Sequence, residues 1–183
     1  MFLPELTPTV IMLSGPPCCG KSRFVDWCLS HNSGIGVASS DYYIEQEAKK
    51  CGMMYNEIFQ HYIPVAEELM KDKTDSFFEA SRSFIWDQTN LVYKTRKRKL
   101  QKFYNAHWNL VGVFFVEATK ELLQSRNTRP GKIIPNEILS DMINRYEVPE
   151  ILSSDEEHKN DDFTLFNSLY YVNAKSGKIV GKV

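Results

Sequence analysis

The sequence has no long apolar run, few cysteines and almost no net charge. Its 183 residues include no stretch of 18 or more apolar residues, which excludes a membrane-spanning helix. The four cysteines, two of them adjacent, do not form a disulfide framework in a chain this long. A net charge of −1 excludes a surface that is basic throughout, although a local basic patch remains compatible with it.

The first five residues have neither a basic region nor a small-residue cleavage site, so we expect no signal peptide. Together with the free cysteines, this predicts a reducing, cytoplasmic location. The sequence predicts no association with a membrane and no particular oligomeric state.

Strands and helices alternate along the chain, which indicates an α/β fold. Short β-branched or aromatic runs predict strands at residues 9–13, 36–40, 83–86 and 110–116. Helical periodicity is present at residues 21–32, 44–70, 95–107, 120–126 and 135–146. In the second of these helices we expect a break near Gly52 and another before Pro64. The alternation favours a parallel sheet with helices on both faces.

The C-terminal part differs in composition from the rest. Residues 153–162 are polar and mostly acidic, which predicts a solvated linker. Residues 169–172 and 178–180 flank a turn and predict a small hairpin. We therefore expect residues 1–152 to form one domain, on which the extension of residues 153–183 packs.

The loop after the first strand matches the phosphate-loop pattern G-x-x-x-x-G-K-S/T. Glycines at both ends let the backbone curl so that amide N–H groups point at phosphate oxygens, and the next helix adds its positive end. Lys21 is expected to contact the β- and γ-phosphates of ATP, and Ser22 to ligate Mg²⁺. The residues expected to bind phosphate are Gly15, Pro16, Pro17, Cys18, Cys19, Gly20, Lys21 and Ser22.

The adjacent cysteines of this loop allow two interpretations. Inward-facing amides favour a thiolate, so Cys18 and Cys19 could have a redox role. They could equally be small residues that fill the loop.

Two aspartates that follow strands are candidate catalytic residues. The chain has neither the N-K-x-D nor the D-x-x-G sequence of a GTPase, which favours a kinase. A kinase needs a carboxylate that accepts the proton of the attacking hydroxyl, and Asp41 follows the second strand. Its alternative role is the N-cap of a helix that begins near Tyr43. Asp87 follows the third strand and is expected to join Ser22 in the metal site; alternatively it forms a turn with Thr89 and Asn90.

The segment 126–132 is rich in cations. Arg126, Arg129 and Lys132 lie around Pro130-Gly131, in a loop that could deliver arginines to the phosphate charge of a transition state. The alternative, positive charge at a helix C-terminus, explains Arg126 but not all three.

These motifs together resemble the phage-type polynucleotide 5′-hydroxyl kinase family. The resemblance covers residues 9–149 and includes the phosphate loop, Asp41, Asp87-Gln88-Thr89-Asn90-Leu91 and residues 126–135. It implies a P-loop kinase-like sheet flanked by helices, with Asp41 as general base. It also implies that Arg126 and Arg129 act on ATP from a lid, beside Lys21 and Ser22.

The sequence departs from this family at three places. Cys18-Cys19 stands where a Gly-Ser pair is frequent, and Gln88 is inserted between Asp87 and Thr89. Ile44 stands where the family has an acceptor-binding arginine. Phosphoryl transfer is compatible with all three changes, whereas the acceptor is less well determined.

One basic stretch could bind nucleic acid. On a helix, Lys94, Arg98 and Lys102 fall on one face, which could contact backbone phosphates or simply be solvated. Beside Asp41, Tyr42 and Tyr43 could stack on a base or be core aromatics. The residues expected to bind the acceptor are Tyr43, Thr89, Asn90, Lys94, Arg98 and Lys102.

The combined prediction is an ATP- and Mg²⁺-dependent kinase that phosphorylates the 5′-hydroxyl end of DNA or RNA. The first alternative is a P-loop kinase of a small metabolite or nucleotide. The second is a non-catalytic ATP-binding module, which would not need a base such as Asp41.

Overall fold

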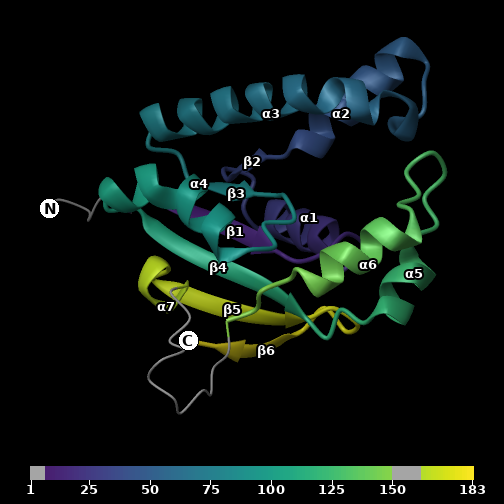
Figure 1. Cartoon of the computed structure of the whole chain (residues 1–183). Helices are drawn as coiled ribbons and strands as arrows, with labels where there is room; N and C mark the ends of the chain where they lie inside the picture. Colours follow the sequence, from purple (N-terminus) through teal and green to yellow (C-terminus); the bar gives the residue numbers. More distant parts are fainter. Residues whose placement is uncertain (1–6, 150–161) are drawn as a thin grey trace, which may run out of the picture.

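The computed structural model describes residues 7–149 and 162–183, and these form a mixed α/β fold (Figure 1). The elements are β1 (Thr9–Ser14), α1 (Lys21–His31), β2 (Gly36–Ala38), α2 (Ser40–Cys51), α3 (Tyr55–Glu79), β3 (Phe84–Trp86), α4 (Tyr93–Asn105), β4 (Asn109–Val116), α5 (Lys120–Arg126), α6 (Asn136–Asn144), α7 (Asp162–Leu165), β5 (Ser168–Asn173) and β6 (Ile179–Lys182).

The strands form a single sheet in the order β2-β3-β1-β4-β5-β6. The first five of these strands are parallel, and β6 is antiparallel to β5. The alternating pattern of the sequence therefore predicted the parallel sheet correctly, and the C-terminal hairpin is confirmed. Because β2, β3 and β1 are neighbouring parallel strands, the loops that follow them meet at one edge of the sheet.

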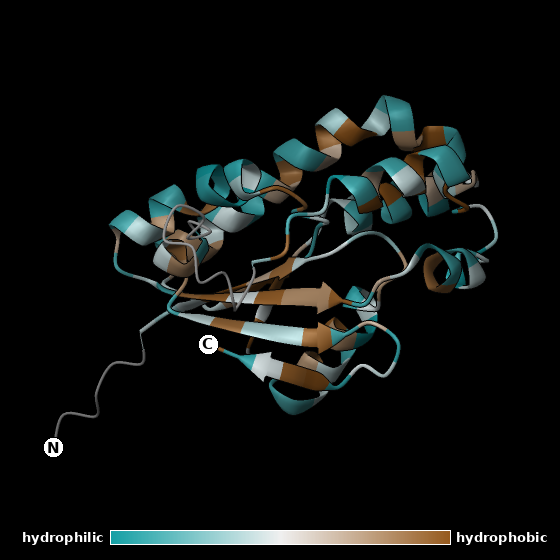
Figure 2. Ribbon diagram, turned by 60° about the horizontal axis from the view of Figure 1, so that its bottom comes forward, coloured by the Kyte–Doolittle hydropathy of each residue, from teal (hydrophilic) through white to brown (hydrophobic). Residues whose placement is uncertain are grey.

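Helices cover both faces of the sheet, each over its own hydrophobic cluster. Met70 and Phe77 of α3 and Leu100 of α4 pack with one face of the strands. Val25 of α1 and Leu123 of α5 pack with the other. In Figure 2 the central strands are mostly hydrophobic, while the helices around them carry hydrophilic residues. Burial on both faces explains why the strands are nearly continuous apolar runs.

Helix α3 continues through Pro64, so the predicted break there is wrong. Proline removes one backbone hydrogen bond but does not break this helix, whose buried side chains Ile58, Ala66, Met70 and Phe77 lie on both sides of it. The break near Gly52 is confirmed, because Gly52 ends α2 in a left-handed conformation with φ 67°.

The acidic segment was predicted to be solvated up to residue 162, and this is wrong at its last residue. Asp162 begins α7, is fully buried and forms an ion pair with Arg96 of α4. The guanidinium of Arg96 also donates to the carbonyl oxygens of Asn90 and Leu91. Residues 153–161 lie outside the described residues.

No helix within residues 7–149 and 162–183 is both long enough and apolar enough to cross a membrane.

Candidate functional site

The loop between β1 and α1 has the backbone of an anion cradle. Cys18 and Gly20 have φ angles of 64° and 111°, so the chain curls sharply just before α1. Close packing also requires glycine at position 15, where a Cβ atom would lie 2.8 Å from Cys19 Sγ and 3.0 Å from Phe115 Cβ. Successive amides in such a curled loop point into one concavity.

The N-terminus of α1 is available to a bound anion. Its N-cap, Gly20, supplies no side-chain hydrogen bond, and the first turn contains no acidic residue. The first N–H groups of a helix therefore face the loop with the positive end of the helix dipole. This geometry fits the phosphates of a nucleotide.

Lys21 lies over the loop. Its Nζ atom donates to the carbonyl oxygens of Gly15 and Pro16, both at 2.8 Å. The loop is anchored to the segment after β3, since Gly15 N donates to Thr89 O at 2.9 Å. Lys21 thus has neutral oxygen partners, which phosphate oxygens could replace.

Asp41 lies in the first turn of α2, three residues beyond the end of β2. The helix begins at Ser40 and its N-cap is Ser39, so the expectation that Asp41 caps a helix starting near Tyr43 is wrong. Both oxygens of its carboxylate are engaged: Oδ1 accepts from the Tyr55 hydroxyl at 2.7 Å, and Oδ2 from Lys132 Nζ at 2.6 Å. The site therefore holds this carboxylate in a fixed orientation.

The protonation of Asp41 depends on competing effects. Burial raises the pKa of this carboxyl, but the charge of Lys132 and the hydrogen bonds from Lys132 and Tyr55 together lower it by more than burial raises it. The net result is a pKa below its ordinary value, so Asp41 is ionised at neutral pH.

Residues 127–135, which we call the lid loop, dock onto α2 and the start of α3. Lys132 also donates to Glu45 at 2.9 Å, and Arg129 pairs with the same Glu45 oxygen at 2.8 Å. Asn56 N and Nδ2 donate to the carbonyl oxygens of Gly131 and Ile133. Sequence analysis grouped Lys132 with the two arginines but did not foresee its contact with Asp41, and it missed Tyr55.

Asp87 is close enough to Lys21 and Asp41 for their charges to act on its pKa. Burial is the largest cause that raises the pKa of Asp87, and the neighbouring charge of Asp41 adds to it. The charges of Lys21 and Lys132 act in the opposite direction. A divalent cation here would relieve the repulsion between the carboxylates, as hard oxygen ligands allow.

The donor set fits a magnesium ion held mainly by phosphate. Ser22 is exposed at the start of α1, on the helix that follows the loop. Within the described ranges, no group of three or more His, Cys, Asp or Glu side chains could hold a metal unaided. Mg²⁺ is commonly bound by one or two protein oxygens together with nucleotide phosphates, and Ser22 with Asp87 fits this pattern.

Arg126 and Arg129, predicted as a pair, are directed to different places. Arg126 donates to Ala174 O at 2.8 Å and Lys175 O at 3.2 Å, and it is 3.5 Å from Cys18 O. Arg129 instead lies over α2 with Glu45. Arg126 is therefore beside the phosphate loop, whereas Arg129 is on the side of Asp41.

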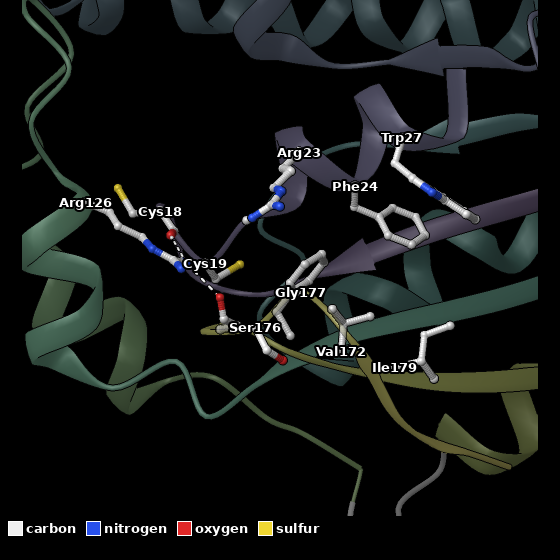
Figure 3. A pocket seen from close by; sticks show the side chains of 13 residues that line it. Cys18, Cys19, Arg23, Phe24, Trp27, Arg126, Val172, Ser176, Gly177 and Ile179 are labelled. Carbon is white, nitrogen blue, oxygen red and sulfur yellow. Dashed lines mark hydrogen bonds between the residues drawn. The ribbon is translucent and has the colours of Figure 1, made fainter. Parts of the chain in front are cut away.

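A cavity of about 470 Å³ opens beside the phosphate loop (Figure 3). Figure 3 shows Arg126 and Ser176 toward one end, and Phe24, Trp27 and Ile179 toward the other. The lining residues are Cys18, Cys19, Gly20, Arg23, Phe24, Trp27, Phe115, Arg126, Val172, Ala174, Ser176, Gly177 and Ile179. An apolar cavity of this size next to an anion cradle fits a nucleotide base.

Comparison with known proteins places this geometry in a family. Residues 10–149 match the family AAA_33, described as an AAA domain. The chain belongs to this family. The match covers β1, the phosphate loop, Asp41, Asp87 and the lid loop of the AAA domain.

Solved structures share the fold at low sequence identity. A chain of the PezAT toxin–antitoxin system of Streptococcus pneumoniae has a TM-score of 0.69 and 11% identity, over 97% of this chain and 72% of that one. A fungal RNA kinase has a TM-score of 0.57 and 14% identity, over 92% of this chain and 39% of its own. A gluconokinase from Sinorhizobium meliloti has a TM-score of 0.51 and 16% identity, over 93% and 85%. The AAA domain thus has the P-loop kinase fold.

The cysteines of the AAA domain are not activated thiols. Burial is the main cause that raises the pKa of Cys18 and of Cys19, and the nearby charge of Lys21 only partly opposes it. The expectation that the loop amides favour a thiolate is therefore wrong. Small loop-filling residues describe both positions better, since Cys19 is buried against Gly15.

Some of the residues expected to bind the acceptor are buried or already paired with other side chains. Asn90 is buried, donates from Nδ2 to Leu13 O at 2.8 Å and accepts from Lys99 at Oδ1. Tyr43 is half-buried and packs with the hydrophobic clusters. Lys102 forms an ion pair with Asp75 at 2.7 Å, and its Nζ atom lies 4.0 Å from the centre of the Phe78 ring.

The other candidates of this set keep their access to solvent. Lys94 and Arg98 are exposed on α4, and Thr89 is half-buried with its carbonyl bound to the phosphate loop. Ile44, which replaces the arginine of the phage-type family, is fully buried between α2 and α3. A cation at position 44 would therefore be buried in the helix pair instead of facing an acceptor.

Proposed function

We propose that this AAA domain is an ATP-dependent kinase that transfers the γ-phosphate to the 5′-hydroxyl of a polynucleotide. The observation that carries the proposal is the oriented, ionised carboxylate of Asp41, which shares an electrostatic environment with Lys21 of the phosphate loop. A binding module needs the phosphate loop but has no use for such a base.

The proposed reaction uses both sides of this site. The acceptor hydroxyl oxygen forms a bond to the γ-phosphorus while the bond from that phosphorus to the bridging oxygen of ADP breaks. The hydroxyl proton passes to Asp41, and ADP leaves with the bridging oxygen. Mg²⁺, when bound, would neutralise phosphate charge between Ser22 and Asp87.

The chain's own residues have distinct roles in this proposal. Loop amides and Lys21 bind the β- and γ-phosphates, and the cavity beside Phe24 and Trp27 takes the base. Arg126 acts from the donor side. Lys132 lowers the basicity of Asp41, and a phosphate group would give its ammonium an alternative partner and so raise that basicity.

The choice of a nucleic acid acceptor has weaker support. The phage-type motifs favour it, a fungal RNA kinase shares the fold, and Lys94 and Arg98 are exposed cations. The ion pair of Lys102 with Asp75 shortens the basic face that was expected to follow a strand. The gluconokinase of the same fold keeps a small metabolite as the alternative acceptor.

Transfer of labelled γ-phosphate to a panel of acceptors tests the proposal. The panel holds 5′-hydroxyl DNA and RNA oligonucleotides, nucleosides and sugars, and Asp41→Asn serves as the catalytically impaired control. We expect labelled oligonucleotide with the wild-type protein only. Labelling of a sugar without any oligonucleotide would contradict the polynucleotide assignment, and ATP binding without transfer to any acceptor would favour a binding module.

A further inference from the structure

The cations of the described residues fall into two groups by exposure. All lysines and arginines there are exposed except Lys21, Arg96, Lys99 and Lys132. Taking a charged group out of water is costly unless a partner compensates it. These cations therefore show where the fold supplies a counter-charge and where it does not.

Carboxylates compensate the charge of two of them. Arg96 pairs with Asp162, and Lys132 pairs with Asp41 and Glu45. These three ion pairs join segments that are distant in sequence, and their charges are neutralised within the protein.

Lys21 and Lys99 are held differently, by neutral oxygens. Lys21 Nζ donates to two carbonyl oxygens of the phosphate loop. Lys99 Nζ donates to Gln88 Oε1 at 2.5 Å and to Asn90 Oδ1 at 2.8 Å, and lies 5.6 Å from the centre of the Trp86 ring. No carboxylate of the described residues lies within ion-pair distance of Lys99.

In Lys21, this arrangement leaves a positive charge ready for an external anion, the nucleotide phosphates. The same physical reasoning applies to Lys99. An ammonium has three donors, and two are used, so one N–H remains for a ligand. Lys99 is half-buried, which leaves part of its side chain accessible.

Lys99 is connected through the side chain of Gln88 to Ser40, the residue before the base of the proposed reaction. Gln88, which accepts from Lys99, donates from Nε2 to Ser40 Oγ at 2.9 Å. Ser40 immediately precedes Asp41 in the first turn of α2. Lys99 therefore belongs to the side of the site where the acceptor hydroxyl would approach Asp41.

We propose that Lys99 binds a phosphate group carried by the acceptor, close to the hydroxyl that is phosphorylated. The inference rests on the proposed kinase function and identifies the acceptor as a molecule that is already phosphorylated. A nucleic acid strand supplies such a group at the 3′ side of its first nucleotide, and a phosphorylated sugar supplies one too. Gln88 and Asn90 hold the ammonium in place, which reduces the entropy lost on binding.

The charge of Lys99 makes this recognition dependent on pH. Burial is the main reason why the pKa of Lys99 is lowered to about 8. The charge of Glu67 in α3 acts to raise this pKa, and the charge of Arg98, in α4 like Lys99, acts to lower it. The ammonium is lost as pH rises through that value, and selectivity for a phosphorylated acceptor falls with it. Because a bound phosphate favours the charged form, it raises the pKa of Lys99.

The test compares a nucleoside 3′-monophosphate with the same nucleoside as acceptors at saturating ATP. For the wild type we expect kcat/KM to be about ten- to a hundredfold higher with the phosphate, as one charge-assisted hydrogen bond allows. Lys99→Met should abolish the difference, Lys99→Arg should restore part of it, and Lys97→Met, exposed on the same helix, should leave it unchanged. If Lys99 only braces Gln88 and Asn90, Lys99→Met would lower kcat/KM equally for both acceptors, which would overturn the proposal.

A second measurement separates this proposal from the kinase function itself. The ¹³Cε resonance of Lys99 is titrated with pH in protein saturated with a non-hydrolysable ATP analogue, alone and with the nucleoside 3′-monophosphate, the nucleoside, a sugar phosphate or inorganic phosphate. A rise of the Lys99 pKa with a phosphorylated compound supports the anion site even if no acceptor is phosphorylated. Transfer to 5′-hydroxyls with no response of Lys99 to any of them would overturn the anion site and leave the kinase function standing.

Discussion

The two sides of this site are built in different ways. The donor side is one contiguous loop, residues 15–22, in which backbone amides and a helix N-terminus form the cradle. The acceptor side is assembled from side chains of α2, α3 and the lid loop, such as Asp41, Tyr55 and Lys132. A contiguous backbone site appears in the sequence as a motif, whereas an assembled site appears only after the chain has folded.

The two sides also differ in how charge is balanced. On the donor side, Lys21 has only neutral partners, two carbonyl oxygens and Cys19 Sγ, and is ready for phosphate. On the acceptor side, Asp41 already has a cation, and Glu45 has two. Substitution of Lys21 should therefore weaken nucleotide binding, whereas substitution of Asp41 should lower turnover and leave binding intact.

The sharpest test of the donor side is Lys21→Ala. The substitution removes the charge on the β- and γ-phosphates, so we expect phosphoryl transfer to be abolished and ATP binding to weaken. Isothermal titration with ATP and a γ-phosphate transfer assay measure the two effects. Lys71→Ala, exposed on α3, is the control, and near-normal transfer by Lys21→Ala would show that the loop does not bind the transferred phosphate.

The corresponding test of the acceptor side is Asp41→Asn. Loss of a general base typically lowers turnover by about a hundredfold or more, and the donor loop is untouched, so ATP affinity should be unchanged. Single-turnover kinetics and ATP titration separate the two. Glu45→Gln, which contacts the same lysine, should lose far less turnover. Equal losses in these two variants would mean that the carboxylate cluster only holds the lid loop.

Arg126 and Arg129 extend the comparison, because one lies on each side. Arg126→Ala removes a guanidinium beside the phosphate loop, and we expect turnover to fall by about ten- to a hundredfold. Arg129→Ala should have a smaller effect, because its charge is neutralised by Glu45. Steady-state kinetics of both variants, with Arg145→Ala at the C-terminal cap of α6 as control, give the order of the two effects. A larger loss of turnover in Arg129→Ala than in Arg126→Ala would mean that Arg129 leaves Glu45 and contacts the phosphates during turnover.

The same contrast explains what could be predicted from the sequence. The strands were predictable because each is a short apolar run buried on both faces, as at residues 110–115. Helix α7 was missed because its buried Asp162 ends an acidic stretch, and only the tertiary contact with Arg96 makes burial favourable. The continuity of α3 through Pro64 likewise depends on packing along its whole length.

Within the site, the predictable part was the part that is local in sequence. The spacing from Gly15 to Ser22 specifies a curled loop before a helix, and this loop is present. The contact of Lys132 with Asp41 spans 91 residues and depends on how the lid loop docks. The position of Lys99 next to Gln88 likewise follows from packing of α4, since a basic helix shows no difference between exposed and half-buried lysines in its sequence.

The smallest expected effect, and the most specific to the acceptor side, concerns the ionisation of Asp41. Without Lys132, only the hydrogen bond from Tyr55 and the charge of Lys21 oppose the effect of burial on this carboxylate, so Lys132→Met should raise the pKa of Asp41. The acid limb of the pH profile of kcat then moves to higher pH, while turnover at its plateau falls by about tenfold at most.

The dependence of folding stability on pH is a second readout of the same ionisation. In the wild type the lowered pKa means that Asp41 stabilises the fold above its unfolded pKa, and this contribution is lost as pH falls through the folded value. In Lys132→Met the folded pKa of Asp41 moves up toward its unfolded value, so this contribution should shrink. Titration of the Asp41 carboxyl carbon by NMR, with Lys120→Met as control, follows the pKa directly, and an unchanged acid limb would show that Lys132 does not set the ionisation of the base.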